Sequence, residues 1–162
     1  MTKREVSKLI TTYKSVRFDL GCGNNKQDGF IGVDIRKCPA VDIVQDLEKF
    51  PWPIPSNCAR SIVISHYWEH ITPRNTLNFM AELHRICTPK ANIFISGPYG
   101  MEFRYVQDPT HCNPTNEATF FYWDPAHPLY QVYRPNPFRV LSFEIFPVGM
   151  SRDFNAVLEA IK

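Results

Sequence analysis

The sequence predicts one α/β domain over residues 1–162, built on a doubly wound, mainly parallel β-sheet with a terminal antiparallel strand pair. Three observations lead to this fold class. The length suits one domain with a single core. Short apolar runs of strand character alternate with helical or loop segments. The first of these runs ends directly in a glycine turn, as the first strand of an open, ligand-binding α/β sheet does.

The segment 1–15 predicts a short amphipathic helix ahead of the sheet. Its apolar residues recur at helical spacing: Val6, Leu9, Ile10 and Tyr13. Strands follow at 16–20 and 30–35. Only ~10 residues separate them, which is the short limit for a parallel crossover. We therefore expect a reduced first crossover whose helix is about one turn long.

A helix is expected in the middle of the chain, with Thr72 as its N-cap and Pro73 in its first position. Pro89 follows its end. Its apolar stripe consists of Phe79, Leu83, Ile86 and Cys87. Strands are predicted on both sides of it, at 41–44, 60–65 and 91–96.

The last third of the sequence has a different character. Residues 98–137 show no clean period and are rich in proline and aromatic residues. A strand is predicted at 138–146. The periodicity of 153–161 allows either a strand or a helix, so both stay open.

Composition narrows the class of protein. A net charge of +2 with mixed signs gives no strongly basic field. No apolar run approaches the ~20 residues that cross a bilayer, so we expect no membrane span. The five cysteines are scattered and never form C-x-x-C, which favours a reduced cytoplasmic protein over a disulfide framework or a structural zinc site. Nothing in the sequence specifies an oligomeric state.

Acidic residues and glycines lie at the carboxyl ends of the first two predicted strands, where open α/β sheets bind ligands. Asp19 precedes Gly21 and Gly23, whose missing side chains let backbone N–H groups approach a ligand closely. Asp34 ends the second strand. Its carboxylate can accept hydrogen bonds from both hydroxyls of a ribose.

The third strand is followed by Asp46 and Leu47, an acceptor for an amino group and an apolar wall for a purine. A dinucleotide-binding turn would carry a small residue at the position of Lys26, with its acid about 20 residues further on. Here Asp34 comes 11 residues after Gly23. A nucleoside ligand without phosphates fits this turn better, and S-adenosyl-L-methionine is such a ligand.

An ordered series of motifs runs through this part of the chain: DLGCG at 19–23, GFIGVD at 29–34, DLxxxPW at 46–52, SHYWEHI at 65–71, ELHRICTPK at 82–90 and NIFISGP at 92–98. The series resembles the class I S-adenosylmethionine-dependent methyltransferases, especially their compact type 11-like group, over about residues 17–98. Members commonly carry a glycine after the proline at 89, where Lys90 and Ala91 stand here.

The resemblance implies S-adenosylmethionine-dependent methyl transfer and a set of cofactor contacts. These are Asp19, Gly21 and Gly23 around the methionine moiety, Asp34 on the ribose, Asp46 and Leu47 at the adenine, and His66 beside the cofactor. Purely structural roles for the same residues stay open. Asp34 could cap a loop, the two glycines could form an ordinary turn, and Asp19 could be an ordinary carboxylate at the end of a strand. A non-catalytic module that only binds the cofactor is the alternative function.

His66-x-x-Glu69-His70 matches the pattern of inverted zinc peptidases, in which two histidines and a glutamate share a helical face. However, His66 directly follows a predicted strand, and the next helix is expected to begin only at Pro73. Two histidines at this spacing need an established helix to converge on a metal. We therefore expect no metal, and His70 is interpreted first as a loop or core histidine.

The acceptor side is assigned to residues 98–137, which follow the fifth strand. His111 with Asp108 is the best acid–base pair there, because the unperturbed pKa of histidine lies near operating pH. A loop-bracing role for His111 is the alternative. The nearby cations, Arg104, Arg134 and Arg139, are too few for a nucleic-acid track. A small-molecule acceptor is therefore favoured, with nucleic acid as the second class.

Overall fold

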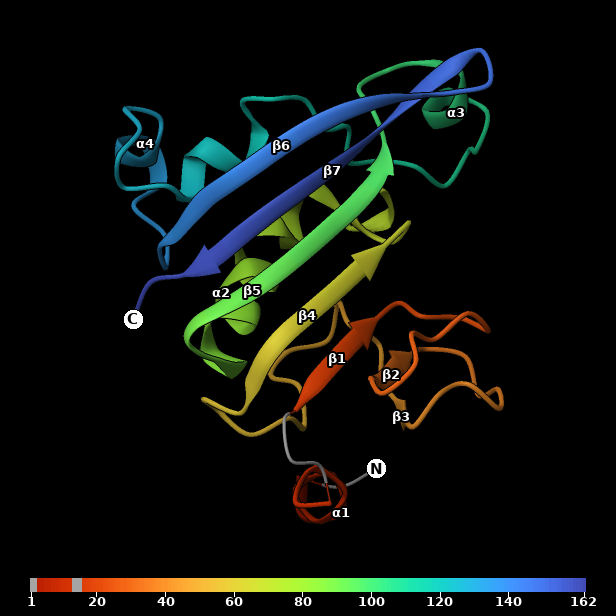
Figure 1. Ribbon diagram of the computed structural model, residues 1–162, viewed down its shortest axis with the longest axis vertical. Helices are drawn as coiled ribbons and strands as arrows, with labels where there is room; N and C mark the ends of the chain where they lie inside the picture. The colour runs from red at the N-terminus through yellow and green to blue at the C-terminus, as the bar shows by residue number, and fades with distance from the viewer. Residues whose placement is uncertain (1–2, 13–15) are drawn as a thin grey trace.

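The computed structural model describes residues 3–12 and 16–162. Its centre is a seven-stranded sheet in the order β3-β2-β1-β4-β5-β7-β6 (Figure 1). The strands are β1 Arg17–Leu20, β2 Ile31–Asp34, β3 Ile43–Val44, β4 Ala59–Ser65, β5 Cys87–Pro98, β6 Phe138–Val148 and β7 Ser151–Ala160. Pairing is parallel from β3 through β5 and antiparallel for β7 with both β5 and β6. The α/β sheet with a terminal antiparallel pair is confirmed.

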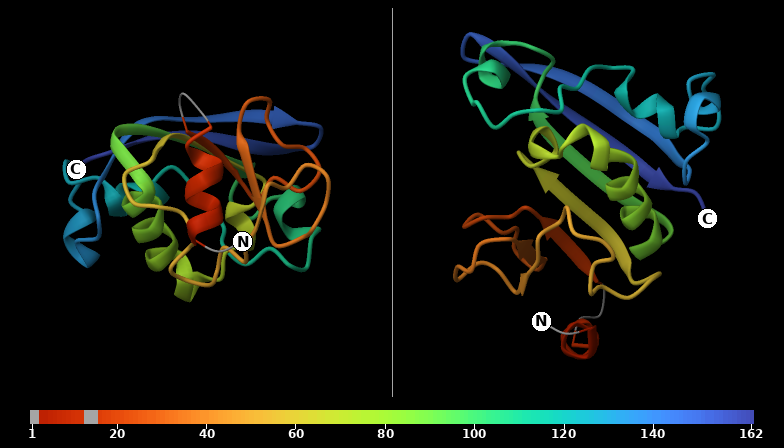
Figure 2. Two further views of the ribbon diagram at one scale, coloured as in Figure 1. Left: turned by 90° about the horizontal axis from the view of Figure 1, so that it is seen from below. Right: turned by 180° about the vertical axis from the view of Figure 1, so that it is seen from behind.

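Helices are short and few. The α-helices are α1 Lys3–Ile10, α2 Thr76–Ile86, α3 Phe103–Val106 and α4 Tyr130–Tyr133. The 3-10 turns are η1 Trp68–His70, η2 Pro73–Asn75 and η3 Thr119–Trp123. Figures 1 and 2 show that α2, η3 and α4 lie against the same face of the sheet, whereas α1 lies beyond the end where β1 begins.

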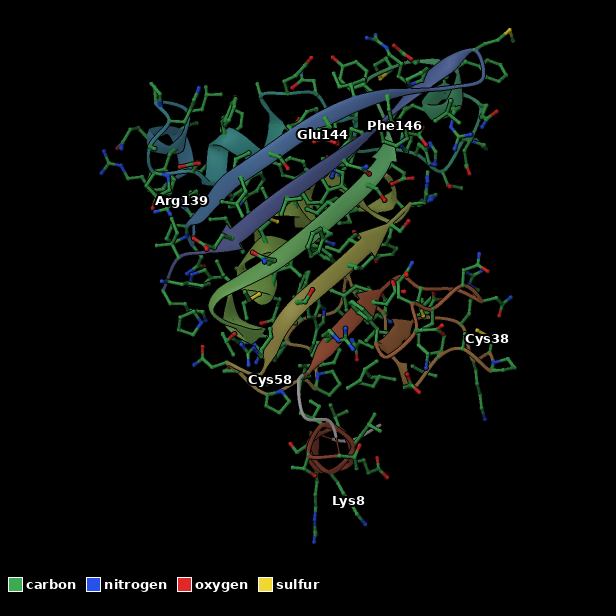
Figure 3. The ribbon with its side chains drawn as sticks, in the orientation of Figure 1. Lys8, Cys38, Cys58, Arg139, Glu144 and Phe146 are labelled. Carbon is green, nitrogen blue, oxygen red and sulfur yellow. The ribbon has the colours of Figure 1, made fainter. Side chains whose placement is uncertain are left out.

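No helix among the described residues covers the opposite face of the sheet, and Figure 3 looks onto that face with Glu144 of β6 labelled. Phe94 of β5 is 41% exposed there. The reason lies in the crossovers: within the described residues, 21–30, 35–42 and 45–58 contain turns and no helix. The first crossover is reduced further than expected, because even the single helical turn is absent. A doubly wound sheet is expected to carry helices on both faces. Here the helices that pack on the sheet lie on one face.

The central helix begins later than its capping signal predicts. Thr72 directly precedes the 3-10 turn η2, and α2 begins only at Thr76. The hydroxyl and N–H of Thr72 donate to the carboxylate of Glu48, so this side chain does not cap the helix. Cys87 is already the first residue of β5, and Pro89 lies inside that strand.

The terminal segment is a strand. Buried residues of β7 alternate along its second half, at Phe154, Ala156, Leu158 and Ala160. This period of two settles the choice between strand and helix. Because β7 enters the sheet between β5 and β6, Asp153 pairs with Pro98 at the carboxyl end of β5.

The hydrophobic core fills the space between the sheet and α2. Its largest fully buried side chains include Trp52, Trp68, Phe79 and Phe120. Val6 and Ile10 of α1 join the same core, whereas Tyr13, predicted on that stripe, lies outside the described residues. Among the described residues, no helix combines the length and apolar character needed to cross a bilayer.

Candidate active site

The segment 66–70, which follows β4, is the centre of the candidate site. Residues of this segment border three hollows that also contain the predicted site residues. The first, of about 390 Å³, is lined by the glycine turn and Asp19. The second, of about 200 Å³, is lined by Asp34, Asp46 and Leu47. The third, of about 230 Å³, is lined by residues of the 98–137 segment.

The glycine turn has a left-handed backbone, with φ of +73° at Gly21 and +53° at Gly23. Such angles favour glycine. At Gly21 a second reason is present, because an added Cβ would lie 2.5 Å from the ring of Tyr67. The absent side chain therefore lets the segment after β4 pack directly on the turn after β1.

Asp34 ends β2 and is 6% exposed. Its Oδ2 accepts the N–H of Gly23 at 2.9 Å, and its Oδ1 accepts the N–H of Arg36 at 2.8 Å and the Arg36 Nε at 3.2 Å. Burial alone would raise the pKa of Asp34, but these hydrogen bonds outweigh it and hold the pKa below its ordinary 3.8. Asp34 is therefore an ionised carboxylate over the neutral pH range.

Asp19 is also buried, at 2% exposed, and its Oδ2 accepts the N–H of Gln27 at 2.8 Å. This bond folds the short crossover back over the end of β1. Burial raises the pKa of Asp19 above its ordinary value, although the Gln27 N–H and the charge of Lys26 oppose the rise. A cation bound beside this carboxylate would compensate its desolvation.

Asp46 and Leu47 are among the residues that line the second hollow. The Oδ1 of Asp46 accepts the N–H of Glu48 at 3.0 Å, which makes a tight turn after β3. Leu47 is only 2% exposed, and its carbonyl accepts the indole N–H of Trp52 at 3.0 Å. Leu47 therefore belongs mainly to the core and presents an edge to the hollow.

His66 lies between the first and third hollows, and its φ of +51° turns the chain sharply away from β4. Its Nδ1 is 3.4 Å from Oε1 of Glu69, and its Nε2 is 3.8 Å from Oδ2 of Asp153. The hydrogen bond to Glu69 is the main cause that raises the pKa of His66 above 6.5. Protonation of His66 is therefore favoured at this junction.

On the acceptor side, the ring of His111 is held by a backbone carbonyl. Its Nδ1 donates to the oxygen of Tyr105 at 2.8 Å, which leaves Nε2 as the other ring nitrogen, and His111 lines the third hollow. Asp108 is near, but its Oδ2 is 3.8 Å from that Nε2, which is longer than a hydrogen bond. The Asp108 carboxylate instead accepts the N–H and hydroxyl of Thr110.

No protein-family model matches the sequence, and no curated protein matches it. Solved structures do match. A SAM-dependent methyltransferase from Archaeoglobus fulgidus is similar with a TM-score of 0.70 and 18% identity, over 97% of this chain and 92% of that one. A SAM-dependent methyltransferase from Methanosarcina mazei has a TM-score of 0.63 and 13% identity, over 94% of this chain and 97% of that one.

A third similar structure is a 16S rRNA (adenine(1408)-N(1))-methyltransferase mutant from Catenulisporales acidiphilia, with a TM-score of 0.63 and 12% identity, over 100% of this chain and 92% of that one. The chain has the class I methyltransferase fold. The strand order and the antiparallel terminal pair described above are those of this fold.

Within the methyltransferase fold, the predicted residues border three hollows that share residues of the segment 66–70. Asp19, Gly21 and Gly23 border the first hollow, and Asp34, Asp46 and Leu47 border the second. His66, Asp108 and His111 line the third. The structure thus brings the predicted residues together around the segment 66–70, but it does not join Asp108 to His111 by a hydrogen bond.

Two functional candidates of the methyltransferase fold, Arg36 and Asp153, were not predicted from the sequence. Arg36 covers Asp34, and Asp153 pairs with Arg104 at 2.9 Å beside the third hollow. Glu69, predicted only as part of the H-x-x-E-H pattern, is buried between His66 and His111. Asp153 could have been found only by taking its segment as a strand antiparallel to residues 92–98, because that pairing alone brings it to the site.

Proposed function

We propose that this protein transfers a methyl group from S-adenosyl-L-methionine to a small acceptor. The observation that carries the proposal is the placement of Asp34: an ionised, buried carboxylate at the end of β2, bonded to a left-handed glycine turn. A ribose needs two adjacent acceptors of this kind, and the turn has no further glycine for a pyrophosphate. The shared fold supports the same function.

The residues fit the parts of this cofactor. Asp19 offers a buried carboxylate for an ammonium group, Asp34 faces the nucleoside side, and Asp46 with the edge of Leu47 borders the space for a purine. The Arg36 side chain is 68% exposed, so it is free to leave Asp34 for solvent when hydroxyls replace it. When bound, the cofactor supplies an electrophilic methyl group on a sulfonium.

The acceptor is proposed to occupy the third hollow. The chain's task there is chiefly alignment, which by itself supplies much of the rate of an in-line displacement. His111 lines this hollow and has its lone pair on Nε2, because Nδ1 is the nitrogen that donates to Tyr105. It can therefore accept a proton from an acceptor hydroxyl or ammonium.

Charge favours a small molecule over RNA, although several structural neighbours are named as methyltransferases of ribosomal RNA or of the 30S ribosomal subunit. The third hollow is bordered by Glu69 and Asp108, and its Arg104 is paired with Asp153. A nucleic-acid backbone needs unpaired cations along its path. The free cysteines fit a reducing compartment such as the cytoplasm.

Calorimetric titration with S-adenosylhomocysteine tests the proposal, with NAD as the comparison ligand. We expect one product molecule to bind per chain and NAD not to bind. Tight NAD binding, or no binding of the product, would contradict the proposal. A methyl-transfer assay with radiolabelled S-adenosylmethionine and co-purified metabolites then separates an enzyme from a non-catalytic cofactor-binding module.

A further inference from the structure

We propose that Glu69, His70 and His111 bind a divalent transition-metal ion at the acceptor end of the site. We also infer that this ion receives an oxygen atom of the acceptor. The metal site stands by itself, whereas its role toward the acceptor rests on the proposed function.

The three side chains come from two segments that the backbone ties together. Glu69 and His70 are neighbours on η1, and His111 belongs to the loop after α3. The carbonyl of Glu69 accepts the N–H groups of Cys112 at 2.8 Å and Asn113 at 3.1 Å. As a result, one ligand atom from each of the three side chains lies within 4.8 Å of the others. The two imidazole rings are 4.7 Å apart and nearly perpendicular.

Both imidazoles keep one nitrogen free, and the hydrogen bonds show which. His111 Nδ1 faces the Tyr105 carbonyl, which can only accept, so its proton is on Nδ1. Thr110 donates its hydroxyl proton to the Asp108 carboxylate at 2.7 Å, so its oxygen accepts from Nδ1 of His70 at 3.0 Å. Each Nε2 is left with a lone pair. Metal-binding histidines are held in this way, with the other nitrogen donating to a carbonyl or a carboxylate-linked group.

Glu69 supplies the negative charge. It is 2% exposed, and its Oε2 has no hydrogen-bond partner within the part of the chain that the structure describes. Its Oε1 is 3.9 Å from Nε2 of His111. Gly97 lets this carboxylate take its position, since a Cβ there would lie 2.8 Å from Oε2 and displace it. A buried carboxylate needs compensating charge. His66 Nδ1 lies 3.4 Å from Oε1 of Glu69, and a cation between Glu69 and the two imidazoles would add further positive charge beside this carboxylate.

The site differs from the H-x-x-E-H pattern in the sequence. His66 is replaced by His111, so the objection that His66 ends a strand does not apply to this group. Two imidazoles and one carboxylate are donors for Zn²⁺, Mn²⁺, Fe²⁺ or Co²⁺ rather than for Mg²⁺. Metal–ligand bonds of about 2.0–2.2 Å would draw the three atoms inward. Three protein ligands leave coordination positions open toward the third hollow, which His70 and His111 line.

An acceptor hydroxyl bound at an open position loses its proton more readily, because the cation stabilises the oxyanion. The proton passes to water, the oxygen forms a bond to the methyl carbon, and the sulfonium–methyl bond breaks to leave a neutral thioether. In this scheme His111 is a metal ligand and not a base, since both roles use the same Nε2 lone pair. The favoured acceptor is then a small molecule with one or two adjacent hydroxyls.

Cobalt titration of the purified full chain tests the site, with visible absorption as the readout. We expect one Co²⁺ per chain and a spectrum typical of nitrogen and oxygen ligands. Binding should weaken at least ~100-fold in His70→Ala and in His111→Ala, and ~10–100-fold in Thr110→Val, which removes only the group that orients His70. His127→Ala is the matched control, because it removes a histidine remote from the cluster. Circular dichroism and product binding verify folding of each variant.

No Co²⁺ binding to the wild-type chain, or equal binding in His70→Ala and His111→Ala, would overturn the metal site. Acetohydroxamate, a small bidentate oxygen ligand, should shift the Co²⁺ spectrum, and an unchanged spectrum would overturn the acceptor role. Cobalt binding without binding of S-adenosylhomocysteine would contradict the proposed function and leave the metal site intact. Binding of S-adenosylhomocysteine without binding of cobalt would overturn the metal site and leave the proposed function intact.

Discussion

The N–H of Gly23 donates to the carboxylate of Asp34 at 2.9 Å, so the acid that ends β2 also holds the glycine turn that ends β1. One residue thereby joins the two hollows proposed for the cofactor. The same bond makes Asp34 both a structural residue and a candidate ligand of the ribose. The first two predictions separate these contributions.

Asp34→Ala should weaken binding of S-adenosylhomocysteine by about 2–3 kcal/mol, because charge-assisted hydrogen bonds to the ribose are lost. Calorimetry measures the change. Asp28→Ala is the control, since Asp28 is an exposed acid in the same crossover and should leave affinity unchanged. Unchanged affinity in Asp34→Ala, in a variant shown to be folded, would remove the ribose contact from the proposal.

Asp34 also predicts a pH dependence of stability. Its pKa in the folded protein lies below 3.8, so its hydrogen bonds stabilise the fold at every pH above that value. This stabilisation is lost as the pH falls through the lower folded-state pKa. Urea unfolding from about pH 6 to pH 2 should show that Asp34→Asn lacks this part of the acid-induced loss. Parallel curves for wild type and variant would contradict the assignment.

Gly21→Ala should destabilise the protein by about 2–4 kcal/mol, because the new Cβ meets both an unfavourable φ and the ring of Tyr67. Gly100→Ala is the matched control. Its φ is also positive, at +56°, but nothing lies within 4 Å of the added carbon. Gly100→Ala should lower the free energy of unfolding by about 1 kcal/mol, from backbone strain alone. Urea unfolding compares the two, and equal costs would show that packing of Tyr67 on the turn is unimportant.

His111→Ala should lower methyl-transfer turnover by ~10²-fold or more, once an acceptor is known, and leave affinity for the cofactor product nearly unchanged. Asp108→Asn should have a smaller effect, because Asp108 bonds to Thr110 and lies 3.8 Å from His111. Steady-state kinetics for both variants provide the measurement. Full activity in His111→Ala would leave alignment alone to explain catalysis.

The short-range features of the cofactor side were predictable from the sequence. Gly21 and Gly23 directly follow an apolar run, and Asp34 ends the next one, so local spacing is enough to place them at strand ends. The stripe of α2 at Phe79, Leu83 and Ile86 is likewise a local period, and all three residues are buried. The start of α2 was predicted too early, because Glu48 from a distant loop competes for Thr72.

The acceptor side depended on contacts between segments far apart in the chain. Sequence spacing paired His66 with His70, whereas the fold sets His111 beside His70 and brings Asp153 to His66 through the antiparallel β5–β7 pairing. The period of 153–161 did not distinguish strand from helix until its neighbours β5 and β6 supplied hydrogen-bond partners.

The sequence by itself determined the glycine turn, the carboxylates at the strand ends and the amphipathic helix, because each depends on the conformation of a few consecutive residues. Tertiary structure alone decided the uncovered face of the sheet, the place of β7 and the meeting of Glu69, His70 and His111. Those features arise from strand pairing and from burial of side chains against one another. Which segments pair and which side chains meet is not encoded in the local pattern of any one segment.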